Sequence, residues 1–425
     1  MFGWIDFSDE ERRRTSEIMN LARYPGAIDE LGFGILRDAF ADKLFPATST
    51  LHTHARYYYL ISYLMKDIER LGCGRSLEQL QTMLQDGEIR TCRRLVAWSK
   101  QQTVPVSGIT GSDSLDSGWV KMTPAFMDWA AIQRLKLFRD PEMKLRGFLR
   151  SVSATSKTDF ASLRPEELYE STTDYSYGSL WDVPYSVYET WDEGDELSLS
   201  LDPVEAEDLK NRIVRYFPNT AYAAIVNCKS ASKSDKTLRD SIYTSDSFID
   251  LVESGALKAI GCNPKLLALC ETAADLSSFV SLLHIRFNHV LRRKAEVTDF
   301  EIDDANTQWQ RHAYDSSSVY HKRTAALNID EAHRACSVSL TSGRNYETHR
   351  FLKAAQAAYL QEDLDTLDTL IERREKHLKG EHRSKIANAK AHADRWVGGI
   401  ELTYRLNIAL MVASEISSSL EANDD

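Results

Sequence analysis

The sequence lacks most of the short motifs by which catalytic sites are recognised. Its 425 residues contain no G-x-x-x-x-G-K-[ST], so the usual phosphate cradle of a P-loop ATPase is excluded. H-E-x-x-H and G-x-S-x-G are also missing, which excludes the common zinc-protease and hydrolase patterns. Gly32-Phe33-Gly34 lacks the third glycine of a dinucleotide fingerprint and follows no predicted strand. We therefore expect no ATP turnover, and favour a protein that is not an enzyme.

The cysteines and the apolar runs are equally uninformative about chemistry. None of the six cysteines belongs to a C-x-x-C pair, which structural zinc usually needs, so we expect reduced thiols, no metal and no cofactor. No run of 18 apolar residues occurs, and the first residues lack the basic start and apolar core of a signal peptide. These absences predict a cytoplasmic protein that does not use a membrane as a partner.

The negative charge is confined to one part of the chain. The net charge is −11, yet residues 159–208 contain 15 Asp or Glu and only one basic residue, Arg164. That stretch carries −14 and the rest of the chain +3. We interpret residues 159–208 as a solvated loop region, and expect basic surfaces elsewhere that can meet a polyanion.

The spacing of apolar and capping residues predicts a mainly α protein. Helices are expected over residues 9–22 (with a Ser8 and Glu11 capping box), 27–44, from Thr48–Thr50 to Leu71, 77–101, from Pro124, 203–216 after Asp202, 247–254, 264–291 with interruptions, and 303–321. A small β element is expected near Leu197–Val226, because Leu197, Leu199 and Leu201 alternate with Ser and 221–226 reads as a short buried strand.

The C-terminal quarter has the clearest helical pattern. Phe351 to Tyr359 and Leu364 to Ile371 predict an antiparallel helix pair, and Val397 to Leu420 predict a terminal helix. We expect three domains. They are an N-terminal helical domain (1–150), a mixed middle region with the acidic insertion and the β element (151–325), and a C-terminal helical domain (326–425).

Several stretches carry a resemblance to a known family. They are Met1-Phe2-Gly3-Trp4-Ile5-Asp6-Phe7-Ser8, the run from Asp29-Glu30-Leu31-Gly32-Phe33-Gly34 to Asp42, Leu44-Phe45-Pro46 through Tyr57, the expected strand and helix from Leu197 to Val226, Leu378-Lys379-Gly380, and Leu402-Thr403-Tyr404-Arg405. With them, the whole chain resembles a bacterial family of unknown function found in anti-phage defence islands, near large helicases and phospholipase-D-like proteins of DISARM-like systems. The Ile and Arg after His284 depart from the small residues expected there. The resemblance implies a defence setting and a helicase-type partner, and no catalytic residues.

Two clusters invite a metal-site interpretation. His52 and His54 form an H-x-H, but helical neighbours two residues apart diverge, so ordinary hydrogen-bonded histidines are expected. Asp299, Glu301, Asp303 and Asp304 could bind Mg²⁺ in a nuclease, yet carboxylates are also typical of a helix start. We favour the helix start.

Arg344 and His349 offer an alternative, enzymatic function. The run Arg344-Asn345-Tyr346-Glu347-Thr348-His349 matches R-N-x-x-x-H, the pattern of helical RNases of the HEPN type. In those enzymes the Arg and the His act across a helical dimer on an RNA phosphodiester. An exposed helix start is the simpler interpretation.

A basic stripe predicts contact with DNA or RNA. It consists of Arg373, Arg374, Lys376, Lys379, Arg383 and Lys385, on both sides of Gly380. Such a stripe can bind phosphates without reading sequence, and the acidic region 159–208 could occupy it in the free protein. The acidic stretch from Tyr169 to Glu196, with Trp181 and Trp191, predicts a surface for a protein partner.

The sequence therefore favours an accessory, non-enzymatic subunit of a multi-gene anti-phage system. It would contact a helicase-type partner and possible DNA or RNA ligands. The alternative is the RNase effector that uses Arg344 and His349. A third hypothesis is a transcriptional or plasmid-maintenance binding protein.

Overall fold

The computed structural model describes residues 29–104, 106–115, 118–155, 179–228, 233–297, 309–315, 317–341, 343–393, 396–397 and 401–424. The chain divides into two compact units. Unit 1 combines 1–44 with 244–404, and unit 2 combines 45–243 with 405–425. Each unit joins segments that are distant in the sequence, whereas the three domains expected above are continuous stretches.

Unit 1 is built around one long helix, α14 (Pro264–Ala295). Asn263 caps its first turn, Pro264 occupies the first helical position, and three basic residues end it at Glu296, which is left-handed with φ 57°. The helix packs against α12, α16, α17 and α19. The other helices of unit 1 are α2 (Gly34–Leu44), α12 (Phe248–Glu253), α13 (Ala256–Ala259), α16 (Val319–Ala326), α17 (Ile329–Ala335), α18 (Gly343–Leu360) and α19 (Leu364–Lys379), with a π-helix at Gln310–Tyr314 and 3-10 turns η4 (Glu381–Arg383) and η5 (Ala389–Ala391).

The interruptions expected within residues 264–291 are absent, because α14 is continuous. Its polar residues are compatible with a buried helix: Ser278 and Ser281 donate to carbonyls one turn earlier, and the Asn288 side chain exchanges hydrogen bonds with the backbone of Val397. By length and composition α14 could cross a membrane, but 67% of its apolar window is buried inside the protein, as in a core helix.

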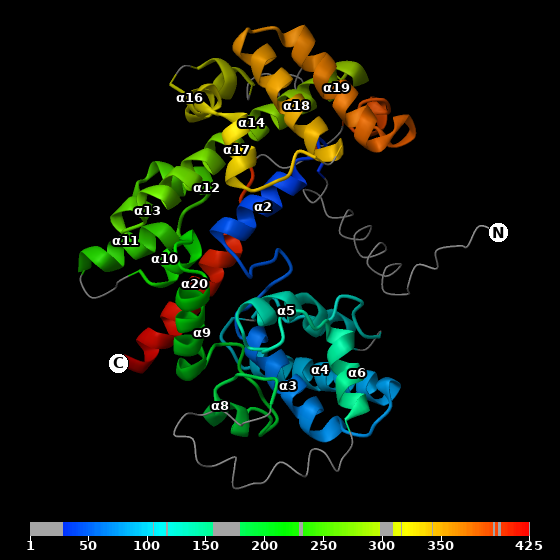
Figure 1. Ribbon diagram of the computed structural model, residues 1–425, viewed down its shortest axis with the longest axis vertical. Helices are drawn as coiled ribbons and strands as arrows, with labels where there is room; N and C mark the ends of the chain where they lie inside the picture. Colours follow the sequence, from blue (N-terminus) through cyan, green and yellow to red (C-terminus); the bar gives the residue numbers. More distant parts are fainter. Residues whose placement is uncertain are drawn as a thin grey trace, which may run out of the picture. The chain divides into compact units, whose positions relative to one another are not determined.

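Unit 2 consists of two groups of helices. One group is α3 (Tyr57–Gly72), α4 (Leu77–Ser99), α5 (Pro124–Arg134) and α6 (Leu145–Ala154), in which α3 contacts the other three. The other is α9 (Pro203–Tyr216), α10 (Ala221–Val226), α11 (Lys233–Tyr243) and α20 (Leu406–Asp424), with α20 lying along α9 (Figure 1). The short helix α8 (Tyr185–Thr190) precedes α9.

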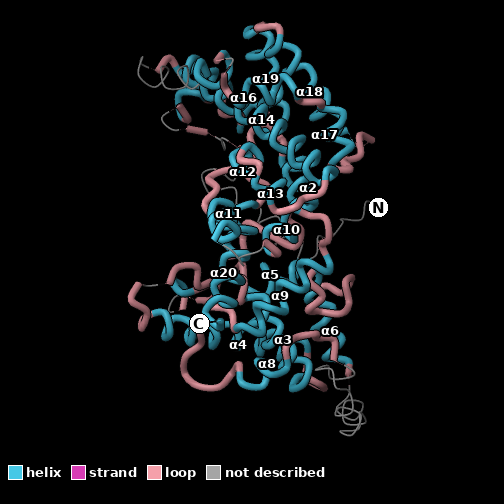
Figure 2. The backbone as a smooth tube through the Cα atoms, turned by 90° about the vertical axis from the view of Figure 1, so that its left-hand side faces the viewer, coloured by secondary structure: helices cyan, strands magenta, loops and turns pink. Residues whose placement is uncertain are grey.

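The expected β element is wrong. Figure 2 shows helices and loops, and the described residues contain no strand beyond an isolated antiparallel bridge between Phe138 and Trp181. Leu197, Leu199 and Leu201 are buried as their alternation predicted, but they lie in a non-helical segment packed on helices, where the Leu197 amide donates to the Arg94 carbonyl. Residues 221–226 form α10, capped by Thr220. The alternating burial was therefore predicted correctly, but it belongs to an irregular segment without a strand partner.

Two helix starts were predicted correctly from local signals: Pro124 begins α5 and Asp202 caps α9. The helix expected over 77–101 is α4, which begins at a capping box formed by Ser76 and Gln79. The antiparallel pair is confirmed as α18 and α19. The terminal helix begins only at Leu406, because Tyr404 and Arg405 are both left-handed, and α3 begins at Tyr57 rather than near Thr48. The expected helix over 9–22 with its capping box, and the acidic cluster at 299–304, lie outside the described residues.

Candidate nucleic-acid interface

The segment Asp29–Gly34 folds into a tight loop against α19. The Asp29 carboxylate accepts hydrogen bonds from the amides of Gly32, at 2.7 Å, and Gly34. Gly32 has φ +79°, and a Cβ there would lie 2.8 Å from the guanidinium of Arg374. Glycine is required at this position for both reasons, because an L side chain rarely adopts that φ and would collide with Arg374.

Arg374 of the predicted stripe fixes this loop to α19. Its Nε donates to the Leu31 carbonyl at 2.9 Å, its terminal nitrogen donates to the Thr348 hydroxyl at 2.6 Å, and its guanidinium lies 5.5 Å from the centre of the Phe351 ring. Arg374 is buried. Its donors serve the fold, so its side chain is a structural clasp in this conformation.

Glu30 holds two further stripe residues. Its side chain is buried, at 1% exposure, and the carboxylate forms ion pairs with Lys385 Nζ at 2.5 Å and Lys379 Nζ at 3.5 Å. A buried carboxylate needs such partners, since an unpaired charge is costly in the interior. Lys379 and Lys385 therefore neutralise Glu30, and they are mostly withdrawn from solvent.

Lys376 belongs to a row of charges between α19 and the end of α14. Glu372 accepts from Lys376 at 2.8 Å and pairs with Lys294 at 2.5 Å. Burial alone would raise the pKa of Glu372, but the hydrogen bonds from Lys294 and Lys376 hold it below its usual value. Of the six stripe residues, Arg373 and Arg383 remain exposed.

The helix pair brings the stripe beside the other predicted site. Because α18 and α19 are antiparallel, the start of α18 lies at the end of α19, as the orange helices of Figure 1 show. Glu347 and His377 lie 3.1 Å apart across the pair. Burial, together with the positive charge of Arg344, lowers the pKa of Arg374. We call the exposed arginines at this end of the helix pair, Arg344, Arg373 and Arg383, the hairpin end.

Arg344 and His349 do not converge within one chain. Residues five apart on an α-helix are separated by about 140° around its axis. His349 Nε2 lies 2.6 Å from Asp330 Oδ1, and its ring packs edge-on against His333 at 4.7 Å between centres. His349 thus faces α17, whereas Arg344 lies toward α19.

His52 and His54 are hydrogen-bonded histidines, as expected. His52 Nδ1 lies 2.8 Å from the Tyr58 hydroxyl, and burial lowers the pKa of His52 to about 4. His54 lies 2.6 Å from Glu415 and 2.9 Å from the Ser107 carbonyl. They lie in the loop that precedes α3, and not on the helix expected there. Within the described ranges, no group of three or more His, Cys, Asp or Glu is placed to hold a metal.

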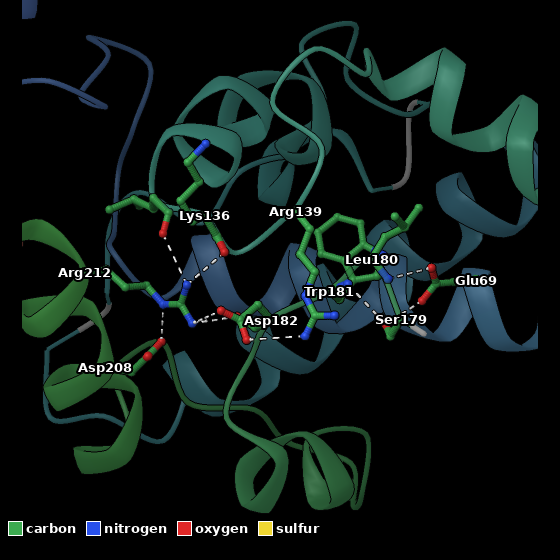
Figure 3. Close-up of polar contacts among 10 residues, drawn as sticks. Glu69, Lys136, Arg139, Ser179, Leu180, Trp181, Asp182, Asp208 and Arg212 are labelled. Carbon is green, nitrogen blue, oxygen red and sulfur yellow. Dashed lines mark hydrogen bonds and ion pairs between the residues drawn. The ribbon is translucent and has the colours of Figure 1, made fainter. Parts of the chain in front are cut away.

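The interpretation of 159–208 as a solvated loop holds for part of the residues that the structure describes, since Glu189, Asp192, Glu193, Asp195, Glu196 and Glu207 are exposed. It is wrong for Glu205, which is buried against Arg56 at 2.9 Å, and even the exposed Asp192 lies 3.0 Å from Arg94. Asp182 and Asp208 surround Arg212 (Figure 3). These acids neutralise arginines of unit 2.

Arg212 shows how completely such a side chain can be used by the fold. Its Nε donates to Asp208 at 2.7 Å, and its terminal nitrogens donate to the carbonyls of Lys136 and Asp182 at 2.9 and 2.7 Å (Figure 3). Together with Glu69, which accepts from Ser179 and Leu180, it secures the chain around 179–182. This cluster is therefore a scaffold, with its donors already occupied.

The expected aromatic partner surface is wrong for its two tryptophans. Trp181 and Trp191 are both buried, and Trp191 Nε1 donates to Asp67 at 3.1 Å. Trp181 packs 4.8 Å from Phe138 between ring centres. They are core residues of unit 2. Residues 169–178 of that stretch lie outside the described part of the chain.

Sequence reasoning missed the Glu30 and Arg374 contacts. They join positions more than 340 residues apart, for which one sequence offers no local signal.

Comparison with known proteins finds a similarity to one family, for which no activity is described. Residues 1–117 are similar to a family described as "Family of unknown function (DUF6361)". The matched segment includes the loop Asp29–Gly34 and helices α2, α3 and α4. No curated protein and no solved structure matches the chain.

Proposed function

We propose that this protein is an accessory, non-enzymatic subunit of an anti-phage defence system, and that it contacts nucleic-acid phosphates through the hairpin end of unit 1. A helicase-type protein is the proposed partner, in the cytoplasm. The defence setting and the partner rest on the resemblance of the stretches quoted from residues 1–57, 378–380 and 402–405. The phosphate contact rests on the charges of the described residues.

The observation that carries the phosphate contact is a set of exposed arginines on a fixed frame. Arg344, Arg373 and Arg383 are exposed, while Arg374 and Glu30 tie the surrounding loop and helices together. Arginine suits phosphate because its planar fork presents several donors. A fixed frame supports binding, since little conformational freedom is lost when the ligand arrives.

The proposal narrows the predicted stripe. The side chains of Arg374, Lys379 and Lys385 are used by hydrogen bonds and ion pairs inside unit 1. Lys376 forms an ion pair with Glu372. Arg344 joins the site from the other helix of the pair. The ligand contact is therefore assigned to Arg344, Arg373 and Arg383.

The test measures binding of the full chain to fluorescein-labelled DNA and RNA across a salt series. Arg344→Glu/Arg373→Glu should weaken binding of every sequence about tenfold or more at low salt. It should also make the salt dependence shallower by about two phosphate contacts. Lys258→Glu/Lys265→Glu makes the same change of charge at two exposed positions elsewhere in unit 1, and it should bind as the wild type does.

Three results would overturn the proposal. Wild-type protein that binds neither nucleic acid at low salt would remove the phosphate contact, and so would a control pair that weakens binding as much as the hairpin pair. RNA cleavage that disappears in Arg344→Ala/His349→Ala would replace the accessory role with the RNase effector. The partner is tested by pull-down of a helicase encoded beside this chain, and by phage protection with and without the chain.

A further inference from the structure

We infer that His377 is a further phosphate ligand of the hairpin end, and that the carboxylate of Glu347 occupies the place of that phosphate in the free protein. The inference deepens the proposed function and rests on it. It adds a phosphate subsite between Arg344 and Arg373, which the carboxylate must leave before the nucleic acid is fully bound.

The contact that carries the inference joins the two helices of the pair. His377 Nε2 lies 3.1 Å from Glu347 Oε2, and the two side chains are 63% and 44% exposed. An ionised carboxylate only accepts hydrogen bonds, so Nε2 carries a proton and donates to Glu347. Carboxylate and phosphate oxygens are acceptors of the same kind for such a donor. Glu347 therefore lies where a phosphate oxygen would be bound.

The two side chains share helix faces with the arginines of the hairpin end. On α19 His377 follows Arg373 by four residues, and on α18 Glu347 follows Arg344 by three, spacings that place side chains on one face of a helix. Because the helices are antiparallel, Arg344 and Arg373 lie on opposite sides of the Glu347 and His377 contact along the helix axes. Burial lowers the pKa of Arg374 on α19, and the charge of Glu347 opposes this shift while that of Arg344 adds to it. The subsite is thus flanked by a cation on each side.

The ligand can displace Glu347 at little cost. Contacts between charged side chains at the surface contribute little to stability, so the carboxylate can turn away from His377. The Glu30 carboxylate differs, because its side chain is 1% exposed and pairs with Lys379 and Lys385. Losing those pairs would leave a buried charge without a partner, which is costly. The contact of Glu347 with His377 is therefore exchangeable, whereas the Glu30 pairs belong to the frame.

The experiment is a double-mutant cycle that measures binding of fluorescein-labelled dT20 to the full chain at low salt. Glu347→Ala removes a negative charge beside the phosphates and leaves the His377 donor available. Each effect is worth about threefold in affinity, so binding should strengthen about tenfold in all. In the His377→Ala background Glu347→Ala removes the charge alone, and the gain should be about threefold.

The matched control is Glu362→Ala. It removes the same charge at an exposed position about 22 Å from Glu347 along the direction of α18, beyond the range of an unscreened charge, and should bind dT20 as the wild type does. None of the altered side chains is buried, so the unfolding temperatures followed by circular dichroism should stay close to that of the wild type.

The outcomes separate this inference from the proposed function. If Arg344→Glu/Arg373→Glu weakens dT20 binding but Glu347→Ala leaves it unchanged, the phosphate contact stands and the subsite is wrong. An equal gain from Glu347→Ala with and without His377 would also refute the subsite, because Glu347 would then act through its charge alone. A gain of the same size in Glu362→Ala would refute it too. If the wild type does not bind dT20, both ideas fail.

Discussion

The adjacent arginines Arg373 and Arg374 should respond to mutation in opposite ways. Arg374→Ala should destabilise unit 1, because Arg374 is buried and donates to the Leu31 carbonyl and the Thr348 hydroxyl. Arg373→Ala, a neighbour of the same type and exposed, should change the free energy of unfolding by less than about 0.5 kcal/mol. The pair is a matched test of which stripe residues serve the fold.

The size of the effect follows from the contacts of Arg374. Each hydrogen bond from a charged donor contributes about 1.5–3 kcal/mol, so the two bonds together contribute about 3–6 kcal/mol. Removing the guanidinium also relieves the cost of keeping it buried, which offsets part of that sum. We expect Arg374→Ala to lower the free energy of unfolding by about 3 kcal/mol.

Urea denaturation of both variants and of the wild type measures this difference. Hydrogen exchange adds a local measurement: about 3 kcal/mol corresponds to roughly hundredfold faster exchange of the α2 and α18 amides in Arg374→Ala. Suppose that Arg374→Ala unfolds at the wild-type urea concentration while its affinity for nucleic acid falls. Arg374 would then be a free phosphate ligand, and the clasp would be refuted.

Three further predictions concern stability. Ser76→Ala removes the capping box of α4 and should cost about 1 kcal/mol in urea denaturation, whereas the same change at exposed Ser418 should cost less than half of that. Arg323→Met leaves the carboxylates of Glu253, Glu271 and Asp275 facing one another, and should lower the free energy of unfolding by roughly 2–4 kcal/mol at pH 7. The loss should be smaller at pH 4, where the carboxylates begin to protonate, and an equal loss at both pH values would contradict this. Burial alone would lower the pKa of His54, but its hydrogen bonds with Glu415 and a backbone carbonyl raise it. The raised pKa stabilises the fold below about pH 6.5 and this contribution is lost as pH rises through it, so the stability difference between wild type and His54→Gln should shrink at alkaline pH; a difference independent of pH would refute the assignment.

Helices that begin at local signals were predictable from the sequence. The capping box at Ser76, the proline at position 124 and Asp202 before α9 each act within four residues, so the residues alone determine where these helices start. The β element was predicted wrongly because the alternating burial of Leu197, Leu199 and Leu201 does not determine which neighbour the segment packs against. Here the neighbours are helices.

The candidate site was only partly predictable, for a related reason. The stripe was visible as a run of cations, yet whether a cation is free depends on residues far away in the sequence. Lys379 and Lys385 form ion pairs with Glu30, and Arg374 donates a hydrogen bond to the Leu31 carbonyl, so none of the three is free to bind a ligand. The pairing of α18 with α19 then supplies Arg344 to the same surface. The charge of a segment can be read from its own residues, whereas the residues that neutralise it can lie anywhere in the chain.

The central claim is that nucleic acid lies on the hairpin end, and photocrosslinking tests it most directly. The full chain would be irradiated with a single-stranded oligonucleotide containing 4-thiothymidine, and the crosslinked peptides identified by mass spectrometry. The account predicts crosslinks on peptides that contain Arg344, Arg373 and Arg383, with loss of these crosslinks in Arg344→Glu/Arg373→Glu. Crosslinks confined to unit 2, or an unchanged pattern in Arg344→Glu/Arg373→Glu, would contradict it.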